Sequence, residues 1–186
     1  DDPPEVRAAR RHYQAPEFFG DGHPDHRADL YALGLVLYEL LTGTTPLERT
    51  RLRESAFGEI VRLIKEEEPP RPSVRLSTLD AEHSSTIADS LGVDQREHSR
   101  LLRGELDWIV MRALEKDRNR RYESASAFAA DVQRYLNDEP VLACPPSNLY
   151  RLRKFVRRHR AGSLFGLVLA LLLISFSVAL TVQNRR

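Results

Sequence analysis

Few side chains in this sequence have the type and spacing that enzyme chemistry or metal binding requires. The six histidines are scattered among loops and charged residues, and no two have the His-x-x-x-His or Glu-x-x-His spacing that places metal ligands on one helical face. The single cysteine, Cys144, stands in Ala-Cys-Pro-Pro, so it allows no disulfide within the chain, suits a reducing compartment and has no neighbour that would activate its thiol. We therefore predict neither a metal site nor a cysteine nucleophile.

Charged residues that could act in pairs are widely separated along the chain. Glu17 closes the run Tyr13-Gln14-Ala15-Pro16-Glu17, Asp29 opens an apolar stretch, and Arg121 belongs to a cluster with Arg118 and Arg120. A guanidinium can hold a carboxylate through two parallel hydrogen bonds, which makes arginine suited to fixing distant segments together. Local sequence alone makes Arg121 typical of a solvated surface arginine.

The element that must position these residues is a helix from Asp29 to Gly43. Its apolar side chains reach almost all the way round a 3.6-residue period, which predicts burial on most sides: Leu30, Leu33, Leu35, Val36, Leu37, Leu40 and Leu41. Asp29 is placed to cap the start or bind backbone, and Gly43 supplies a left-handed stop. We expect a core helix with a domain around it.

Ala15-Pro16-Glu17 is followed twelve residues later by Asp29-x-Tyr31-x-x-Gly34 and then by Leu37-Tyr38-Glu39-Leu40-Leu41-Thr42-Gly43. In this order and spacing the motifs resemble the C-terminal lobe of eukaryotic-like Ser/Thr protein kinases. The resemblance covers roughly residues 13–160 and implies a mainly α fold, the helical C-lobe of a protein-kinase-like domain without its N-lobe. It also implies that the substrates of the full-length parent are proteins.

The same resemblance assigns structural roles to several residues. Leu114 to Tyr122 is similar to the family's Asp-Pro-x-x-Arg segment, which makes Arg121 the partner of Glu17. Asp29 would accept hydrogen bonds from the backbone of a catalytic loop. The structural kinase motif in this chain is then Ala15, Pro16, Glu17, Asp29, Gly34 and Arg121, and the candidates for contact with a peptide substrate are Tyr13, Ala15 and Pro16.

The groups that transfer phosphate in kinases are missing from these residues. There is no Gly-x-Gly-x-x-Gly and no Asp-Phe-Gly, and His26-Arg27-Ala28-Asp29 is not the catalytic His-Arg-Asp because the residue five after Asp29 is Gly34 and not asparagine. We predict no catalytic, cofactor-binding or metal residue here, with ATP and Mg²⁺ bound only by a full-length parent whose other half precedes Asp1. Since Ala9-Arg10 replaces the family's Gly-Thr, a non-catalytic pseudokinase or membrane-tethered interaction module stays open as the alternative.

Further helices are expected along the chain. Phe57, Ile60, Val61 and Ile64 form one stripe that ends at Pro69-Pro70, and a second and a third stripe follow: Leu106, Ile109, Val110, Ala113 and Leu114, then Phe128, Ala129, Val132 and Leu136. Residues 69–104 are rich in proline and serine, which predicts a flexible insertion. It resembles an insertion in a bacterial subgroup of membrane-anchored kinases, and its serines are either solvated linker or phosphorylation sites.

The C-terminal part has the composition of a membrane anchor. No charged residue occurs from Ala161 to Asn184, which predicts a transmembrane helix over 161–183. Six Arg or Lys residues precede it in 151–160, so residues 1–160 are expected to be cytoplasmic and the C-terminal end to lie on the far side. The basic run also suits anionic lipid, and Gly162 and Gly166 have a spacing that allows helix dimerisation.

Charge and boundaries complete the sequence-based interpretation. All 27 acidic residues but only 20 of the 28 basic ones lie in 1–150, which leaves that part with a net charge of about −7 and argues against nucleic-acid binding. The predicted division is an activation-segment end and loop (1–28), C-lobe helices with the insertion (29–140), a basic juxtamembrane linker (141–160), the transmembrane helix (161–183) and the start of a far-side region (184–186). A helical, tail-anchored adaptor unrelated to kinases is a third interpretation.

Overall fold

The described part of the chain is helical and contains no strand. The computed structural model describes residues 13–20, 23–47, 55–78, 95–145 and 147–158, together with Leu172, Ser175 and Gln183. Its helices in chain order are η1 (Pro16–Phe19), α2 (Arg27–Thr42), α4 (Phe57–Glu66), α5 (Pro72–Thr78), α7 (Gln95–Leu102), α8 (Glu105–Ala113), η2 (Arg118–Arg120), α9 (Ala125–Leu136) and α10 (Asn148–Arg158). This architecture agrees with the mainly α class predicted from the sequence.

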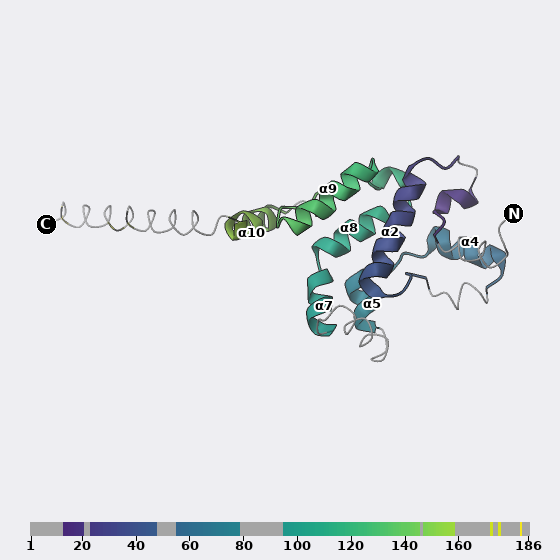
Figure 1. The fold of residues 1–186 in the computed structure, drawn as a ribbon, viewed down its shortest axis with the longest axis horizontal. Helices are drawn as coiled ribbons and strands as arrows, with labels where there is room; N and C mark the ends of the chain where they lie inside the picture. The colour runs from purple at the N-terminus through teal and green to yellow at the C-terminus, as the bar shows by residue number, and fades with distance from the viewer. Residues whose placement is uncertain are drawn as a thin grey trace.

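Helix α2 runs through the middle of the domain and packs against α5 and α8 (Figure 1). It begins two residues earlier than predicted, and the carboxylate that accepts a hydrogen bond at its start, from the backbone N–H of Arg27 at 2.8 Å, belongs to Asp25 and not to Asp29. The helix ends at Gly43 in the left-handed conformation, φ 69°, with its N–H donating to the carbonyl of Glu39. The predicted glycine stop is therefore present.

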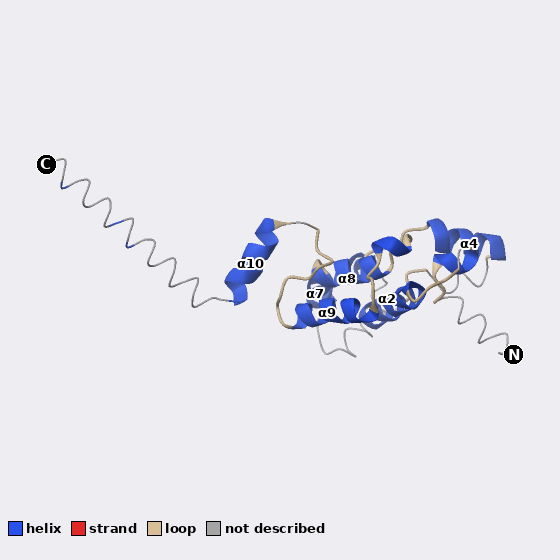
Figure 2. Ribbon diagram, turned by 90° about the horizontal axis from the view of Figure 1, so that it is seen from above, coloured by secondary structure: helices blue, strands red, loops and turns tan. Residues whose placement is uncertain are grey.

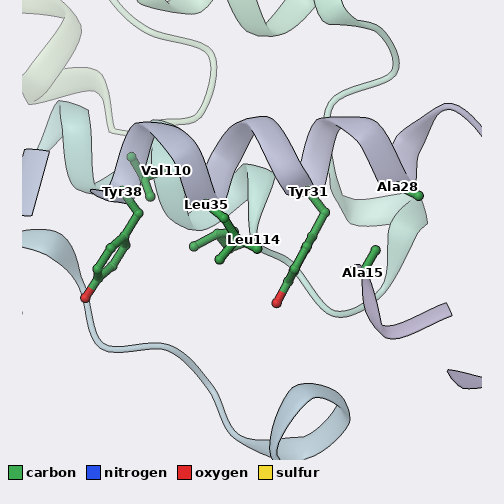
Figure 3. Packing of buried hydrophobic residues seen from close by; sticks show 7 residues of the cluster. All are labelled: Ala15, Ala28, Tyr31, Leu35, Tyr38, Val110 and Leu114. Atoms are coloured by element: carbon green, nitrogen blue, oxygen red, sulfur yellow. The ribbon is translucent and has the colours of Figure 1, made fainter. Parts of the chain in front are cut away.

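One face of α2 forms the main core. Its buried side chains project toward α8 and the segment before η1, and the cluster consists of Ala15, Ala28, Tyr31, Leu35, Tyr38, Val110 and Leu114 (Figure 3). The prediction of burial on most sides is wrong for the described residues, because Leu33 and Val36 are each 43% exposed and Leu40 is 70% exposed. These three residues share one helical face, which the described part of the chain leaves uncovered.

Gly34 lies where α2 packs tightly against the end of α8. A Cβ at this position would lie 2.7 Å from the Cβ of Ala113 and 3.1 Å from Cδ2 of Leu114, so only glycine fits without a shift. The stripe predicted for α8 is buried as expected, with Ile109, Val110 and Ala113 fully inaccessible to solvent.

Two helices lie in the stretch expected to be a flexible insertion. In α5 the backbone N–H and hydroxyl of Ser73 donate to the carboxylate of Asp107, at 3.0 and 2.7 Å. Leu76 of α5, Leu102 of α7 and Leu106 of α8 form a second buried cluster. The polar composition gave no sign of these helices, because the residues that they pack against lie at the far end of the stretch or beyond it. Residues 79–94 lie outside the described part.

The third predicted helix, α9, is present with Ser124 as its N-cap, whose hydroxyl accepts from the N–H of Ala127 at 3.1 Å. Its expected inward face differs, because Ala129 is exposed and Leu136 is 68% exposed. The fully buried residue of this helix is Asp131.

The Asp131 carboxylate is a buried acceptor for groups from two directions. It accepts from the hydroxyl of Tyr122 at 2.9 Å and from the backbone N–H groups of Leu142 and Ala143 at 2.6 and 2.8 Å. Arg134 supplies a positive charge at 3.1 Å. Because a buried carboxylate is stable only with such partners, this arrangement fastens the segment after α9 to the domain.

Helix α10 occupies part of the stretch expected to be a juxtamembrane linker, and it lies at the end of the domain opposite α4 (Figure 1, Figure 2). Within the described residues, no helix combines the length and the apolar character needed to cross a membrane. The predicted transmembrane helix over 161–183, with Gly162 and Gly166, lies outside the described residues apart from Leu172, Ser175 and Gln183.

Candidate functional site

The guanidinium of Arg121 is fully buried, and all five of its N–H donors have acceptors. Nη1 and Nη2 donate to the two carboxylate oxygens of Glu17 at 2.7 and 2.8 Å. Nη1 also donates to the carbonyl of Arg27 at 2.9 Å, Nη2 to that of Lys116 at 3.2 Å, and Nε to that of Glu115 at 2.7 Å. Since no donor is left over, the buried charge is fully compensated.

Glu17 reaches Arg121 because η1 begins at Pro16, whose fixed φ suits the first helical position. The side chain of Glu17 is 11% exposed. Burial by itself raises the pKa of this carboxyl, but the hydrogen bonds and positive charge of Arg121, with a backbone hydrogen bond, outweigh burial and lower the pKa below its ordinary value of 4.5. Glu17 is therefore held in the charged form that the ion pair needs.

Tyr31 forms the floor of this site. Its ring lies under the guanidinium of Arg121, with 4.9 Å between the guanidinium carbon and the ring centroid, a cation–π arrangement. Burial raises the pKa of the Tyr31 hydroxyl to about 12. The hydroxyl thus stays neutral beside the ion pair at physiological pH.

The residues expected to contact a peptide substrate lie next to this site with different exposure. Tyr13 is half-buried, and its hydroxyl donates to Oε2 of Glu39 at 2.5 Å. Ala15 is fully buried in the main core, and Pro16 is buried too. Ala15 packs in the main core and Pro16 is buried beside it, so Tyr13 is the residue of the three with the most accessible surface.

Asp29 and Gly34 take no part in the ion pair. Asp29 is exposed in the first turn of α2, on the same helical face as Leu33 and Val36. Gly34 is buried at the α2–α8 crossing. The structure therefore brings together Glu17 and Arg121 of the predicted motif, and it places Asp29 and Gly34 elsewhere along α2.

Several groups in the site were not foreseen. The carbonyls of Arg27, Glu115 and Lys116 carry no residue-specific signal, so sequence could not have indicated them. Tyr31 could have been noticed, because it lies within the Asp29-x-Tyr31-x-x-Gly34 motif.

The arrangement is suited to holding a segment and not to reacting with a substrate. Every donor of Arg121 is engaged within the protein, and the Glu17 carboxylate is paired, so neither group is available for proton or phosphate chemistry. Among residues 13–158 for which side chains are described, no three His, Cys, Asp or Glu side chains gather closely enough to hold a metal ion. The site therefore clamps η1 to the loop after α8.

A helical domain in which a buried arginine holds a glutamate of η1 beside a central helix is consistent with the C-terminal lobe of a protein kinase. The chain is 32% identical over 125 residues, 65% of its length, to the Ser/Thr protein kinase pkn3 of Myxococcus xanthus. It is 32% identical over 128 residues, 69% of its length, to the Ser/Thr protein kinase PknB of Mycobacterium tuberculosis. A probable Ser/Thr protein kinase of Streptomyces coelicolor is also 32% identical, over 129 residues.

Homologues of this chain are thus bacterial Ser/Thr protein kinases. The matched region spans 17% of the Myxococcus kinase and 16% of the Mycobacterium kinase, so the chain corresponds to about one sixth of the length of these relatives. No protein-family model matches the chain.

Proposed function

We propose that this chain is the C-terminal lobe region of a membrane-anchored bacterial Ser/Thr protein kinase, a transferase that moves the γ-phosphate of ATP to protein hydroxyls. In the full-length parent ATP and Mg²⁺ are held by residues outside this chain, and the chain supplies the helical platform. By itself it is inactive, because its sequence has none of the motifs that bind nucleotide or position the acceptor hydroxyl.

The ion pair between Glu17 and Arg121 is the observation that carries this proposal. It joins residues 104 positions apart, and the sequence motifs on both sides of it, Ala15-Pro16-Glu17 and Lys116 to Arg121, are the ones that resemble protein kinases. In a kinase such a clamp would fix the end of the activation segment next to the surface that receives a protein substrate.

The uncovered face of α2 supports a larger catalytic domain. Asp29, Leu33, Val36 and Leu40 share one face of this helix and are exposed to solvent in the described structure. Burial of an apolar stripe is favourable, and exposed apolar patches are typical of surfaces that another element or partner covers. The catalytic loop, whose backbone Asp29 would bind, belongs on this face.

Membrane anchoring is the part of the proposal that comes from sequence alone. Residues 161–184 carry no charge, and the basic run over 151–160 places the kinase region on the cytoplasmic side. The second candidate is a membrane-tethered pseudokinase, which is favoured by Ala9-Arg10 at the position of the family's Gly-Thr and by the lack of serine and threonine in residues 1–12.

Phosphate transfer by the longer protein tests the proposal. The gene region upstream of Asp1 is expressed together with this chain, and incorporation of phosphate from radiolabelled ATP into a generic protein substrate is measured with Mg²⁺. We expect transfer by the longer protein and none by residues 1–186. A longer protein that folds and binds ATP without transferring phosphate would instead support the pseudokinase.

Two variants of the longer protein connect its activity to the clamp. Arg121→Ala removes the buried guanidinium, whereas Arg118→Ala removes a neighbouring arginine whose side chain is 41% exposed. We expect a large loss of transfer for the first variant and near-normal transfer for the second. Equal activity of both variants would remove the role proposed for the ion pair.

A further inference from the structure

Helix α10 turns a polar face toward the domain and an apolar face toward solvent, which is the opposite of the usual arrangement for a surface helix. Tyr150 and Lys154 face the domain, and Lys154 is only 7% exposed. On the opposite face Leu149, Leu152 and Val156 are 80%, 59% and 45% exposed. These three leucine and valine side chains follow the i, i+3, i+7 spacing of one helical face, and we refer to them as the α10 stripe.

Charged side chains hold the inner face of α10 to the domain. The ammonium of Lys154 lies 2.8 Å from carboxylate oxygens of both Glu105 and Asp138. Arg157 pairs with Asp138 and Arg158 pairs with Glu139, each at 2.9 Å. These ion pairs fix the helix in an orientation that turns the α10 stripe outward.

Aromatic contacts set the same orientation. The hydroxyl of Tyr150 accepts a hydrogen bond from the N–H of Val141 at 3.1 Å, and its ring meets that of Trp108 edge to face with 5.5 Å between centroids. Rotation of α10 that buried the stripe would break this contact and strand the buried ammonium of Lys154.

The apolar surface continues beyond the stripe. Leu152 also lines a groove of about 650 Å³ between α10 and the loop that precedes it, where Val141, Leu142 and Pro145 contribute apolar walls. Leu142 is itself 63% exposed. Charged side chains of Asp138, Arg151 and Lys154 line the same groove. Exposed apolar surface of this kind is typical of an interaction site.

Charge on both sides of the stripe indicates which occupant fits. With 100° of rotation per residue, Arg153 falls at one border of the stripe and Arg151 beyond the other, and both are exposed. Apolar residues flanked by cations match a membrane interface that contains anionic lipid. The apolar side chains would contact acyl chains, and the cations would contact the headgroups. The uncharged sequence 161–184 begins three residues after α10 ends.

We propose that α10 lies flat in the interface of an anionic bilayer, with the α10 stripe among the acyl chains and the kinase-like domain held above it by Lys154. The inference rests on the membrane anchoring in the proposed function, and it adds a second contact that fixes how the domain faces the membrane. The anchor alone would leave the domain free to rotate about its linker.

Depth measurements on the full chain in vesicles test the proposal. In a Cys144→Ser background, Leu149→Cys, Leu152→Cys and Val156→Cys each carry a nitroxide, and the chain is reconstituted into phosphatidylcholine vesicles with or without phosphatidylglycerol. Leu136→Cys is the matched control, because Leu136 is an exposed leucine, 68%, on α9. Accessibility to oxygen and to a water-soluble nickel reagent gives the depth of each label.

We expect the three stripe labels about 5–10 Å below the headgroup boundary and the label at 136 in water. Omitting phosphatidylglycerol should move the stripe labels toward water, and equal depth in both vesicles would remove the role of anionic lipid. Replacing Leu149 by glutamate should release the labels at 152 and 156 from the bilayer, whereas Leu136→Glu should leave them in place.

Three results would overturn the inference and are distinguishable from each other. Stripe labels as wet as the label at 136, on a chain that resists carbonate extraction, remove the interfacial helix and leave the proposed anchor intact. A chain that carbonate releases from the vesicles removes both. Stripe labels that couple to each other, and lose the coupling on dilution with unlabelled chain without gaining depth, would assign the stripe to a second copy of the chain.

Discussion

Arg121 and Glu17 are joined by two parallel hydrogen bonds of 2.7 and 2.8 Å, although the loop after α8 and the start of η1 are 104 residues apart in sequence. The guanidinium also donates to three backbone carbonyls, so this one side chain joins η1, the start of α2 and the loop after α8. The stability of the domain should therefore depend on this contact.

Removing the guanidinium should destabilise the domain strongly. Arg121→Ala removes the two donors that hold the carboxylate of Glu17 and three further hydrogen bonds to carbonyls, a loss of about 3–5 kcal/mol for a broken buried pair. Arg118→Ala removes a half-exposed side chain that donates to the carbonyl of His23 at 3.1 Å and lies 3.8 Å from Asp25, and it should cost about 1 kcal/mol. Urea unfolding followed by circular dichroism measures both, and equal losses would contradict the buried clamp.

Acid should weaken the same contact in a defined direction. The pKa of Glu17 is lower in the folded protein than its ordinary value of 4.5, so its contribution to stability is complete above that value and is lost as the pH falls through the lowered pKa. Glu17→Gln has no proton to gain, so its stability should fall less steeply below about pH 4.5. Identical slopes of unfolding free energy against pH for both proteins would exclude a linked titration.

The α2–α8 crossing should tolerate no methyl group at Gly34. In Gly34→Ala the new Cβ would lie 2.7 Å from the Cβ of Ala113, which forces the helices apart and should cost about 1–3 kcal/mol. Gly58→Ala in α4 is the matched control, because a methyl group there would meet nothing within 4 Å and the helix should gain about 0.4–1 kcal/mol. A change of the same sign in both melting temperatures would contradict this packing.

Lys116 should titrate near neutral pH. Burial lowers its pKa to about 8, and its ammonium donates to the carbonyl of Ile64 at 2.6 Å. The ¹³Cε chemical shift of Lys116 should therefore change around pH 8. Because the charge of Glu67 opposes the effect of burial, Glu67→Gln should move the midpoint lower still, and a midpoint that stays near 10.5 in both proteins would show that the amine is solvated.

Local patterns were enough to predict the parts of the fold that depend on neighbouring residues. The left-handed stop at Gly43 and the apolar stripe of α8 are properties of short stretches of sequence, and both are present. The contact between Glu17 and Arg121 could not be predicted from any short stretch of sequence, because the two residues are 104 positions apart. It was expected because both ends match motifs of one family, and the structure brings the two groups together.

The rest depended on partners that composition does not show. Serine and proline made the start of α5 typical of a linker, yet Ser73 is buried because the carboxylate of Asp107, 34 residues on, satisfies its polar groups. In α9 the apolar period favoured Leu136 for the core, whereas the buried position went to Asp131. The apolar period of α2 predicted burial on most sides. In the described part of the chain only one side of this helix is packed against other elements.

The buried carboxylate of Asp131 links the segment that leads into α10 to the region next to the Glu17–Arg121 pair. It grips the backbone of Leu142 and Ala143 ahead of α10 and, on its other side, the hydroxyl of Tyr122, the residue next to Arg121. Tension applied through α10 would bear on this carboxylate through the backbone of residues 142 and 143, in parallel with the ion pairs of Lys154, Arg157 and Arg158. A pull at the C-terminal end would thus strain Tyr122, the sequence neighbour of the arginine that holds η1.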